Sequence, residues 1–98
     1  MKAVFDESSP AWVNNPEYNI MFLRRQQDYV NDALKRRGWV TIMDVFDVLG
    51  LSFDINDLLS IPLRDQCWLY EDRDYIDFGM KPNVEKNVIY LDFNINID

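Results

Sequence analysis

One long amphipathic helix is the feature that most constrains how this chain can fold. Asn15 is a residue type that caps helix N-termini, and Pro16 suits the first helical position, where its missing N–H costs nothing. Apolar residues then recur at helical spacing and form one stripe, namely Tyr18, Phe22, Tyr29, Val30, Ala33 and Leu34. Gly38 follows a basic last turn, as is common where helices end. We therefore predict a helix over about residues 16–37, with this stripe facing the core.

Polar residues on the same segment are explained by the helix itself. Gln26 falls between Phe22 and Tyr29, and we predict that it hydrogen-bonds inside the core, because buried amides are usually satisfied internally. The alternative is that Gln26 faces a cleft. On the other side, Asp32 is expected to reach Arg36 at the i,i+4 spacing that stabilises helices. The basic residues of the last turn oppose the negative end of the helix dipole, so no ligand is needed to explain them.

A second, shorter helix is predicted by signals at both of its ends. Thr41 followed by Asp44 matches a capping box, in which each side chain bonds the backbone N–H of the other residue. Gly50 followed by Leu51 matches a Schellman end. These signals predict a helix over about residues 41–49. The many β-branched residues in this stretch leave a strand as the alternative.

Two further segments carry fewer signals. Ser52 can cap a helix and Pro62 cannot continue one, so a short third helix is predicted over about residues 53–60. Residues 1–14 have no sustained hydrophobic period, and we predict that they form an N-terminal arm. The residues that could anchor this arm to the domain or to a neighbour are Phe5, Trp12 and Val13.

From Gln66 onward, the hydrophobic period changes to two. The strings CWLYE and DYIDFGM predict a hairpin closed by Asp72, Arg73 and Asp74. The string VIYLDFNINI then places Ile89, Leu91, Phe93, Ile95 and Ile97 on one face and Tyr90, Asp92, Asn94 and Asn96 on the other. Such alternation is typical of an antiparallel sheet with one solvent-facing side.

Taken in order, these elements predict a single α+β domain over residues 15–98, preceded by the arm. A long N-terminal helix and one or two short helices are expected to pack on a three-stranded antiparallel sheet. A chain of 98 residues suits one hydrophobic core and no more. The order of helix, short strand, helix, short helix and hairpin also matches the winged-helix domains.

Composition excludes most enzyme chemistry. The chain has no histidine and one cysteine, so the commonest proton shuttle and the usual zinc ligands are missing. Its three glycines are isolated, which excludes the glycine-rich motifs of nucleotide-binding proteins. The carboxylates near the predicted hairpin lack the mid-loop glycine and terminal glutamate of a calcium-binding loop. We expect no catalytic residue, no cofactor and no metal site.

The uneven distribution of charge indicates the kind of partner. The formal net charge is −7, and residues 38–98 hold four basic residues against twelve acidic ones. That part would repel nucleic acid, whose affinity for proteins comes largely from cations. We predict a protein partner, basic in character, for the aromatic and acidic side chains near one sheet face, namely Tyr70, Glu71, Asp72, Asp74, Tyr75, Asp77, Tyr90 and Asp92. The alternatives are an ordinary hydrated sheet face and binding through the basic helix.

The sequence also predicts where the protein works. The start MKAVFDESSPAW lacks the apolar run of a signal peptide, and no stretch approaches the roughly eighteen apolar residues that span a bilayer. The lone Cys67 cannot form an internal disulfide, which suits a reducing compartment. We therefore expect a cytoplasmic protein with no membrane contact.

Four strings, NPEYNIMFLRRQQDYVNDALKRRG, DVFDVLGL, YIDFGM and VIYLDFNI, resemble a family of small uncharacterised proteins encoded by phages and prophages of Gram-positive bacteria. The resemblance runs from about residue 14 to residue 95. It implies a phage setting, in the host cytoplasm or the virion, and the same domain, but no catalytic or binding residues. The acidic stretch LSFDINDLLSIPLRD departs from the small-residue and basic segment usual in that family.

The leading functional hypothesis is a protein-binding phage accessory protein without enzyme activity. It would act either as an inhibitor of a host nucleic-acid enzyme by acidic mimicry or as a small virion or assembly component. The alternative is a winged-helix DNA-binding protein, with residues 53–60 as recognition helix and Arg73 at the wing tip. Asp54 and Asp57 oppose that alternative, because they would face the phosphates without a cation.

Overall fold

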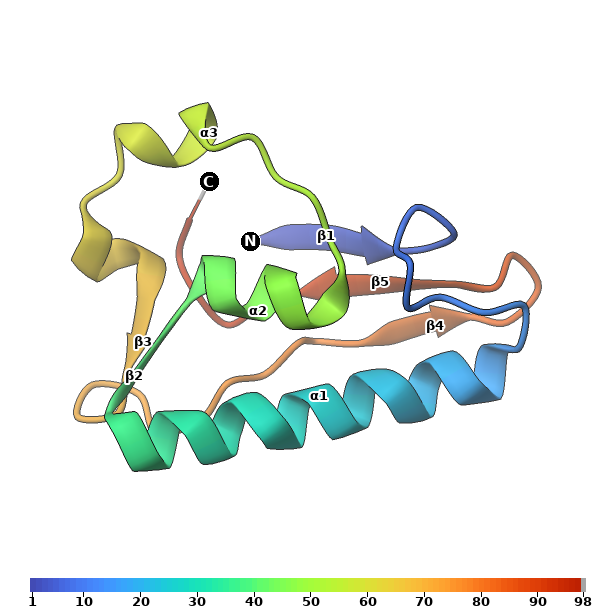
Figure 1. Ribbon diagram of the computed structural model, residues 1–98, viewed down its shortest axis with the longest axis horizontal. Helices are drawn as coiled ribbons and strands as arrows, with labels where there is room; N and C mark the ends of the chain where they lie inside the picture. The colour runs from blue at the N-terminus through green and yellow to red at the C-terminus, as the bar shows by residue number, and fades with distance from the viewer. Residues whose placement is uncertain (98) are drawn as a thin grey trace.

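The computed structural model describes residues 1–97 and has the expected α+β fold (Figure 1). The elements follow in this order: β1 (Lys2–Phe5), α1 (Pro16–Arg37), β2 (Trp39–Thr41), α2 (Ile42–Leu49), α3 (Asn56–Leu59), the 3-10 helix η1 (Leu63–Gln66), β3 (Cys67–Leu69), β4 (Lys81–Asn83) and β5 (Val88–Asp92). The strands form a three-stranded antiparallel sheet, in the order β1-β5-β4, and a two-stranded antiparallel sheet of β2 and β3. Helix α1 runs along one long margin of the molecule, on the β4 side of the larger sheet (Figure 1).

Helix α1 begins and ends where the sequence predicts, and it buries Val30, Ala33 and Leu34 of the predicted stripe but not the two tyrosines. The Asn15 side chain accepts a hydrogen bond from the Tyr18 backbone N–H, and Gly38 ends the helix in the left-handed conformation. Tyr18 and Tyr29 are 51% and 55% exposed, so they do not belong to the core stripe. The buried residues of the helix are Asn19, Leu23, Val30, Ala33 and Leu34. The stripe is rotated because Tyr side chains with polar tips are stable in water, whereas amides on the inner face bond the backbone of other segments.

Two polar predictions for α1 were wrong. The glutamine whose side chain bonds other segments is Gln27, which contacts two residues of the 75–78 segment, while Gln26 is half-buried and its side chain makes no hydrogen bond within residues 1–97. Asp32 and Arg36 form no ion pair in the same part of the chain. Both charged side chains are exposed, where water competes with such pairs.

Helix α2 confirms the end signals and excludes the strand alternative. The Thr41 hydroxyl accepts from the Asp44 N–H and the Asp44 carboxylate accepts from the Thr41 N–H, both at 3.0 Å. The Leu51 N–H bonds the Phe46 carbonyl beyond the helix. The third helix is shorter than predicted, because α3 is a single turn and Ser52 does not cap it.

The first residues contain a strand that their sequence did not indicate. Strand β1 pairs with β5, placing Phe5 opposite Ile89, and the fully buried Phe5 ring stacks on Phe22 with centroids 5.7 Å apart. The strand has the sequence KAVF, in which three apolar residues follow one another without alternation, so only the pairing with β5 defines it. The following segment is attached to the domain by two side chains. The Ser9 hydroxyl donates to the Leu49 carbonyl at 2.7 Å, and the Trp12 indole N–H donates a second hydrogen bond.

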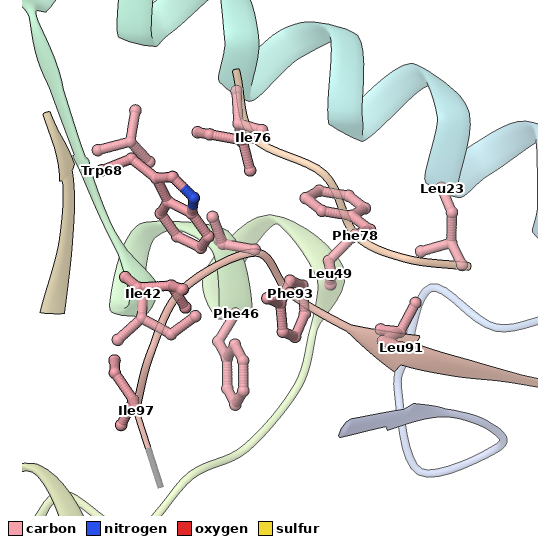
Figure 2. Close-up of a cluster of buried hydrophobic side chains, with 14 of the residues drawn as sticks. Leu23, Ile42, Phe46, Leu49, Trp68, Ile76, Phe78, Leu91, Phe93 and Ile97 are labelled. Atoms are coloured by element: carbon pink, nitrogen blue, oxygen red, sulfur yellow. The ribbon is translucent and has the colours of Figure 1, made fainter. Parts of the chain in front are cut away.

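The predicted hairpin over residues 67–80 does not form. Strand β3 pairs with β2 instead, with Val40 opposite Trp68, and no strand lies between Leu69 and Lys81. This pairing buries the large Trp68 ring against the core, a gain that a hairpin at the surface would lack (Figure 2). The wing of the winged-helix hypothesis needed that hairpin.

The alternation at the C-terminal end was predicted correctly for burial but not for strand length. Residues 89, 91, 93, 95 and 97 are all buried, yet β5 ends at Asp92. The chain beyond it turns past α2, where Phe93 packs on Phe46 and Phe78 (Figure 2). Asn94 is half-buried rather than solvent-facing.

Candidate binding surface

The eight predicted binding residues lie in three places rather than on one sheet face. Only Tyr90 and Asp92 are in a strand, and both are exposed on β5. Asp77 lies in the extended segment that precedes β4. The other five are in the segment that follows β3, here called the acidic loop (residues 70–75), and are Tyr70, Glu71, Asp72, Asp74 and Tyr75. The structure therefore brings five of the eight together.

Hydrogen bonds hold the first part of the acidic loop. The Tyr70 N–H donates to the Gly38 carbonyl at 2.9 Å, which ties the loop to the end of α1. The N–H groups of Asp72 and Arg73 both donate to the Leu69 carbonyl, at 2.9 and 2.8 Å. The Arg73 guanidinium donates to the Asn94 carbonyl. The turn is thus fixed to the domain at both its start and its middle.

The end of the loop is fixed by the amide side chains of α1. The Gln27 amide donates to the Tyr75 hydroxyl at 2.6 Å and accepts from the Phe78 N–H at 2.9 Å. Asn31 accepts from the Ile76 N–H at 2.7 Å and donates to the Ile76 carbonyl at 2.9 Å. Both backbone groups of Ile76 are thereby satisfied. The Asn31 side chain on α1 makes the two hydrogen bonds that a neighbouring strand would otherwise make.

Asn94 joins the loop to the two-stranded sheet. Its side-chain oxygen accepts from the Trp68 indole N–H at 2.9 Å and from the Asp77 N–H at 2.8 Å. Its side-chain nitrogen donates to the Tyr75 carbonyl at 2.8 Å. The period-two alternation had predicted a solvent-facing Asn94, because that pattern does not distinguish a hydrated amide from one bonded to other segments.

The outer face of β5 is not uniformly acidic. Tyr90 lies opposite Val4 on β1 and Lys81 on β4, and Asp92 lies opposite Lys2. Cross-strand partners share a face of the sheet, so both lysines flank the predicted residues. A basic partner would therefore meet less negative charge there than at the acidic loop.

An exposed tryptophan that was not among the predicted binding residues lies next to the loop. Trp39 lies opposite Leu69, the last residue before the loop, and Arg37 stacks over its ring at 4.3 Å from the centroid. Arg37 also pairs with Asp44 at 3.0 Å. The only signal in the sequence was a tryptophan between the helix-ending Gly38 and the buried Val40.

A family model matches residues 1–98, the whole chain. The protein belongs to the family of unknown function DUF6353. No curated protein and no solved structure matches it.

The described side chains at this surface of the DUF6353 chain offer charge and hydrogen bonding. Within residues 1–97, no three His, Cys, Asp or Glu side chains are grouped so that they could hold a metal ion. Burial, together with the nearby Asp44 carboxylate, raises the pKa of the Cys67 thiol, which lowers its reactivity at neutral pH. No helix in the described part of the chain is long and apolar enough to cross a membrane.

Proposed function

We propose that this protein is a non-enzymatic phage accessory protein that binds a basic protein partner through the acidic loop. The phage setting is supported by the sequence resemblance, which implies action in the host cytoplasm or in the virion. The choice of loop is supported by its composition, since tyrosines with polar tips are favoured at interfaces and carboxylates select basic partners.

The observation that carries this proposal is a rigidly held loop with exposed side chains. Tyr70 and Tyr75 are 43% and 50% exposed, and Glu71, Asp72 and Asp74 are exposed beside them. The backbone groups of Tyr70, Asp72 and Tyr75 are bonded to Gly38, Leu69 and Asn94 in turn. A surface whose backbone is already ordered loses less conformational entropy when a partner binds, so more of the contact energy remains as affinity.

Affinity capture with the full chain tests the proposal. A loop variant removes three negative charges through Glu71→Gln, Asp72→Asn and Asp74→Asn. A control variant removes three exposed charges elsewhere through Glu7→Gln, Asp47→Asn and Glu85→Gln. The wild type and the control are expected to capture the same basic protein from a lysate of infected host cells, whereas the loop variant loses it. Equal capture by the loop variant would refute binding through the loop.

Two forms of the proposal differ in their partner. An inhibitor that mimics nucleic acid would capture a host nucleic-acid enzyme, and added DNA would displace the protein from it. A virion or assembly component would capture a phage protein from infected cells only. A chain that captures no host protein would contradict the inhibitor.

The DNA-binding alternative has one structural feature in its favour. Strands β2 and β3 pair across the two intervening helices, as the winged-helix order requires. Its recognition helix, however, would be the single turn α3, which carries Asp57 and no basic residue. A gel shift at low salt would support this alternative, and its absence would exclude it.

A further inference from the structure

The face of α1 that points away from the core carries a regular exposed stripe. Its members are spaced alternately by three and four residues, the spacing that places side chains on one face of a helix. This outer stripe comprises Tyr18, Met21, Arg25, Asp28, Asp32 and Lys35, and all six are exposed. Tyr18 and Met21 are each 51% exposed, although both are largely apolar. Helix α1 forms one margin of the molecule (Figure 1), and the exposure of all six side chains leaves the stripe open to another helix.

Charges along this side of α1 alternate in blocks. From the N-terminal end, an acidic Glu17 is followed by the basic pair at 24–25, the acidic pair at 28 and 32, and a basic end from Lys35. A second copy lying antiparallel about the middle of the helix places Arg25 opposite Asp28 and Glu17 opposite a basic residue of the last turn. Asp32 then lies opposite Met21. A parallel copy instead places every charge opposite a like charge. Within residues 1–97, none of these side chains forms an ion pair except Arg37 of the basic end.

We propose that two copies of this chain associate through their α1 helices, packed antiparallel around a two-fold axis between Gln26 and Gln27. That axis lies at the middle of Pro16–Arg37, so the helices overlap along their whole length. Arg25 then faces Asp28 of the second copy, and the symmetry repeats this pair. Tyr18 faces Lys35 at each end of the contact, where the ammonium and its alkyl chain can cover the ring.

The size of the contact sets its strength. Helix α1 has 22 residues, which makes it about 33 Å long. A single helix pair covers less than the roughly 800 Å² per partner of a standard stable interface. The dimer is therefore weak and depends on concentration, and exposed ion pairs fix its orientation more than its affinity. This surface is separate from the acidic loop, so the inference does not rest on the proposed function.

Charge reversal across the axis tests the pairing by sedimentation equilibrium of the full chain. Arg25→Asp and Asp28→Arg are each expected to weaken dimerisation at least tenfold, because each sets like charges opposite one another. The double variant restores the pair with the wild-type net charge, so its dimerisation constant is expected to return to within threefold of the wild type. Matched reversals away from the stripe, Lys86→Asp and Glu85→Arg, are expected to leave the constant unchanged. A wild type that stays monomeric at millimolar concentration, or a double variant as weak as the single ones, would overturn the proposal.

Cross-linking tests the orientation separately. In a Cys67→Ser background, a mixture of Tyr18→Cys and Lys35→Cys chains is expected to form mixed disulfide dimers, since antiparallel packing places these positions opposite each other. Disulfide dimers of Tyr18→Cys chains alone would indicate parallel packing and contradict the proposal.

Discussion

Strand β5 and residues 76–78 are neighbours joined by a main-chain bond from the Asp92 N–H to the Phe78 carbonyl at 2.9 Å, but the N–H groups of the two segments donate to different kinds of acceptor. Strand β5 lies between β1 and β4, so main-chain groups satisfy it on both sides. In contrast, three successive N–H groups, those of Ile76, Asp77 and Phe78, each donate to a side-chain amide oxygen. A hydrogen bond between two main-chain groups remains after most substitutions. A hydrogen bond to a side chain is lost when the residue that carries this side chain is replaced. The two regions should therefore differ sharply in their tolerance of mutation.

The largest effect is expected at Gly79, where the two regions meet. Gly79 has a φ of 58°, and a Cβ there would collide with the Asp92 carbonyl of β5. Gly79→Ala should lower the free energy of unfolding by about 3 kcal/mol, from backbone strain and the displaced strand. Gly38→Ala is the matched control, because its φ of 86° is also left-handed but no atom lies within 4 Å. A loss at Gly79 no greater than that at Gly38 in urea titration would refute the close contact.

Asn94 is the next most sensitive position. Asn94→Ala removes the acceptor of two N–H groups and the donor to the Tyr75 carbonyl, so we expect a loss of about 2 kcal/mol. Asn96→Ala, two residues further on and exposed, should change stability by less than about 0.5 kcal/mol. Thermal unfolding of both variants measures the difference. Equal effects would mean that Asn94 is an ordinary surface amide.

Two adjacent glutamines test the structure against the sequence-based prediction, because the structure gives the hydrogen bonds to Gln27 and the sequence predicted them for Gln26. Gln27→Ala should cost about 1 kcal/mol, since the Phe78 N–H loses its acceptor, while Gln26→Ala should cost close to nothing. Amide exchange is the sharper measurement. Exchange of Phe78 should accelerate in the Gln27 variant only, with β5 unchanged. Faster exchange of the Phe78 amide in the Gln26 variant would instead support the prediction that Gln26 is the hydrogen-bonded glutamine.

The smallest effect concerns a side-chain bond at the surface. The Ser8 hydroxyl and N–H both donate to the Asp6 carboxylate, and they hold the pKa of Asp6 below its usual 3.8. A carboxylate with a lowered pKa contributes stability above its unfolded pKa, and that contribution disappears as the pH falls through the folded value. Ser8→Ala should raise the Asp6 pKa toward 3.8 in an NMR titration. An unchanged pKa would assign the shift to the backbone bond alone.

Local signals predicted the elements whose causes lie within a few residues. The caps at Asn15, Gly38 and Thr41 fixed the bounds of α1 and α2 because each bond joins close neighbours in the chain. The alternation around β5 predicted its buried residues for the same reason.

Long-range partners explain what the sequence could not predict. Asn31 bonds Ile76 across 45 residues, and Trp68 pairs with β2 rather than with the strand expected after it. No local pattern distinguishes an amide that holds a distant backbone from one in water. For this reason the eight predicted binding residues do not lie on one sheet face. Five of them lie together only because they are consecutive or nearly consecutive in the sequence.

The central claim is that helix α1 acts as the neighbour of residues 76–78 while β3 pairs with β2. Nuclear Overhauser effects in the uniformly labelled protein test it most directly. The account predicts contacts from the Ile76 amide proton to the Asn31 side-chain amide, together with cross-strand contacts between Val40 and Trp68. Cross-strand contacts between β3 and residues 75–80, with none to Asn31, would contradict it.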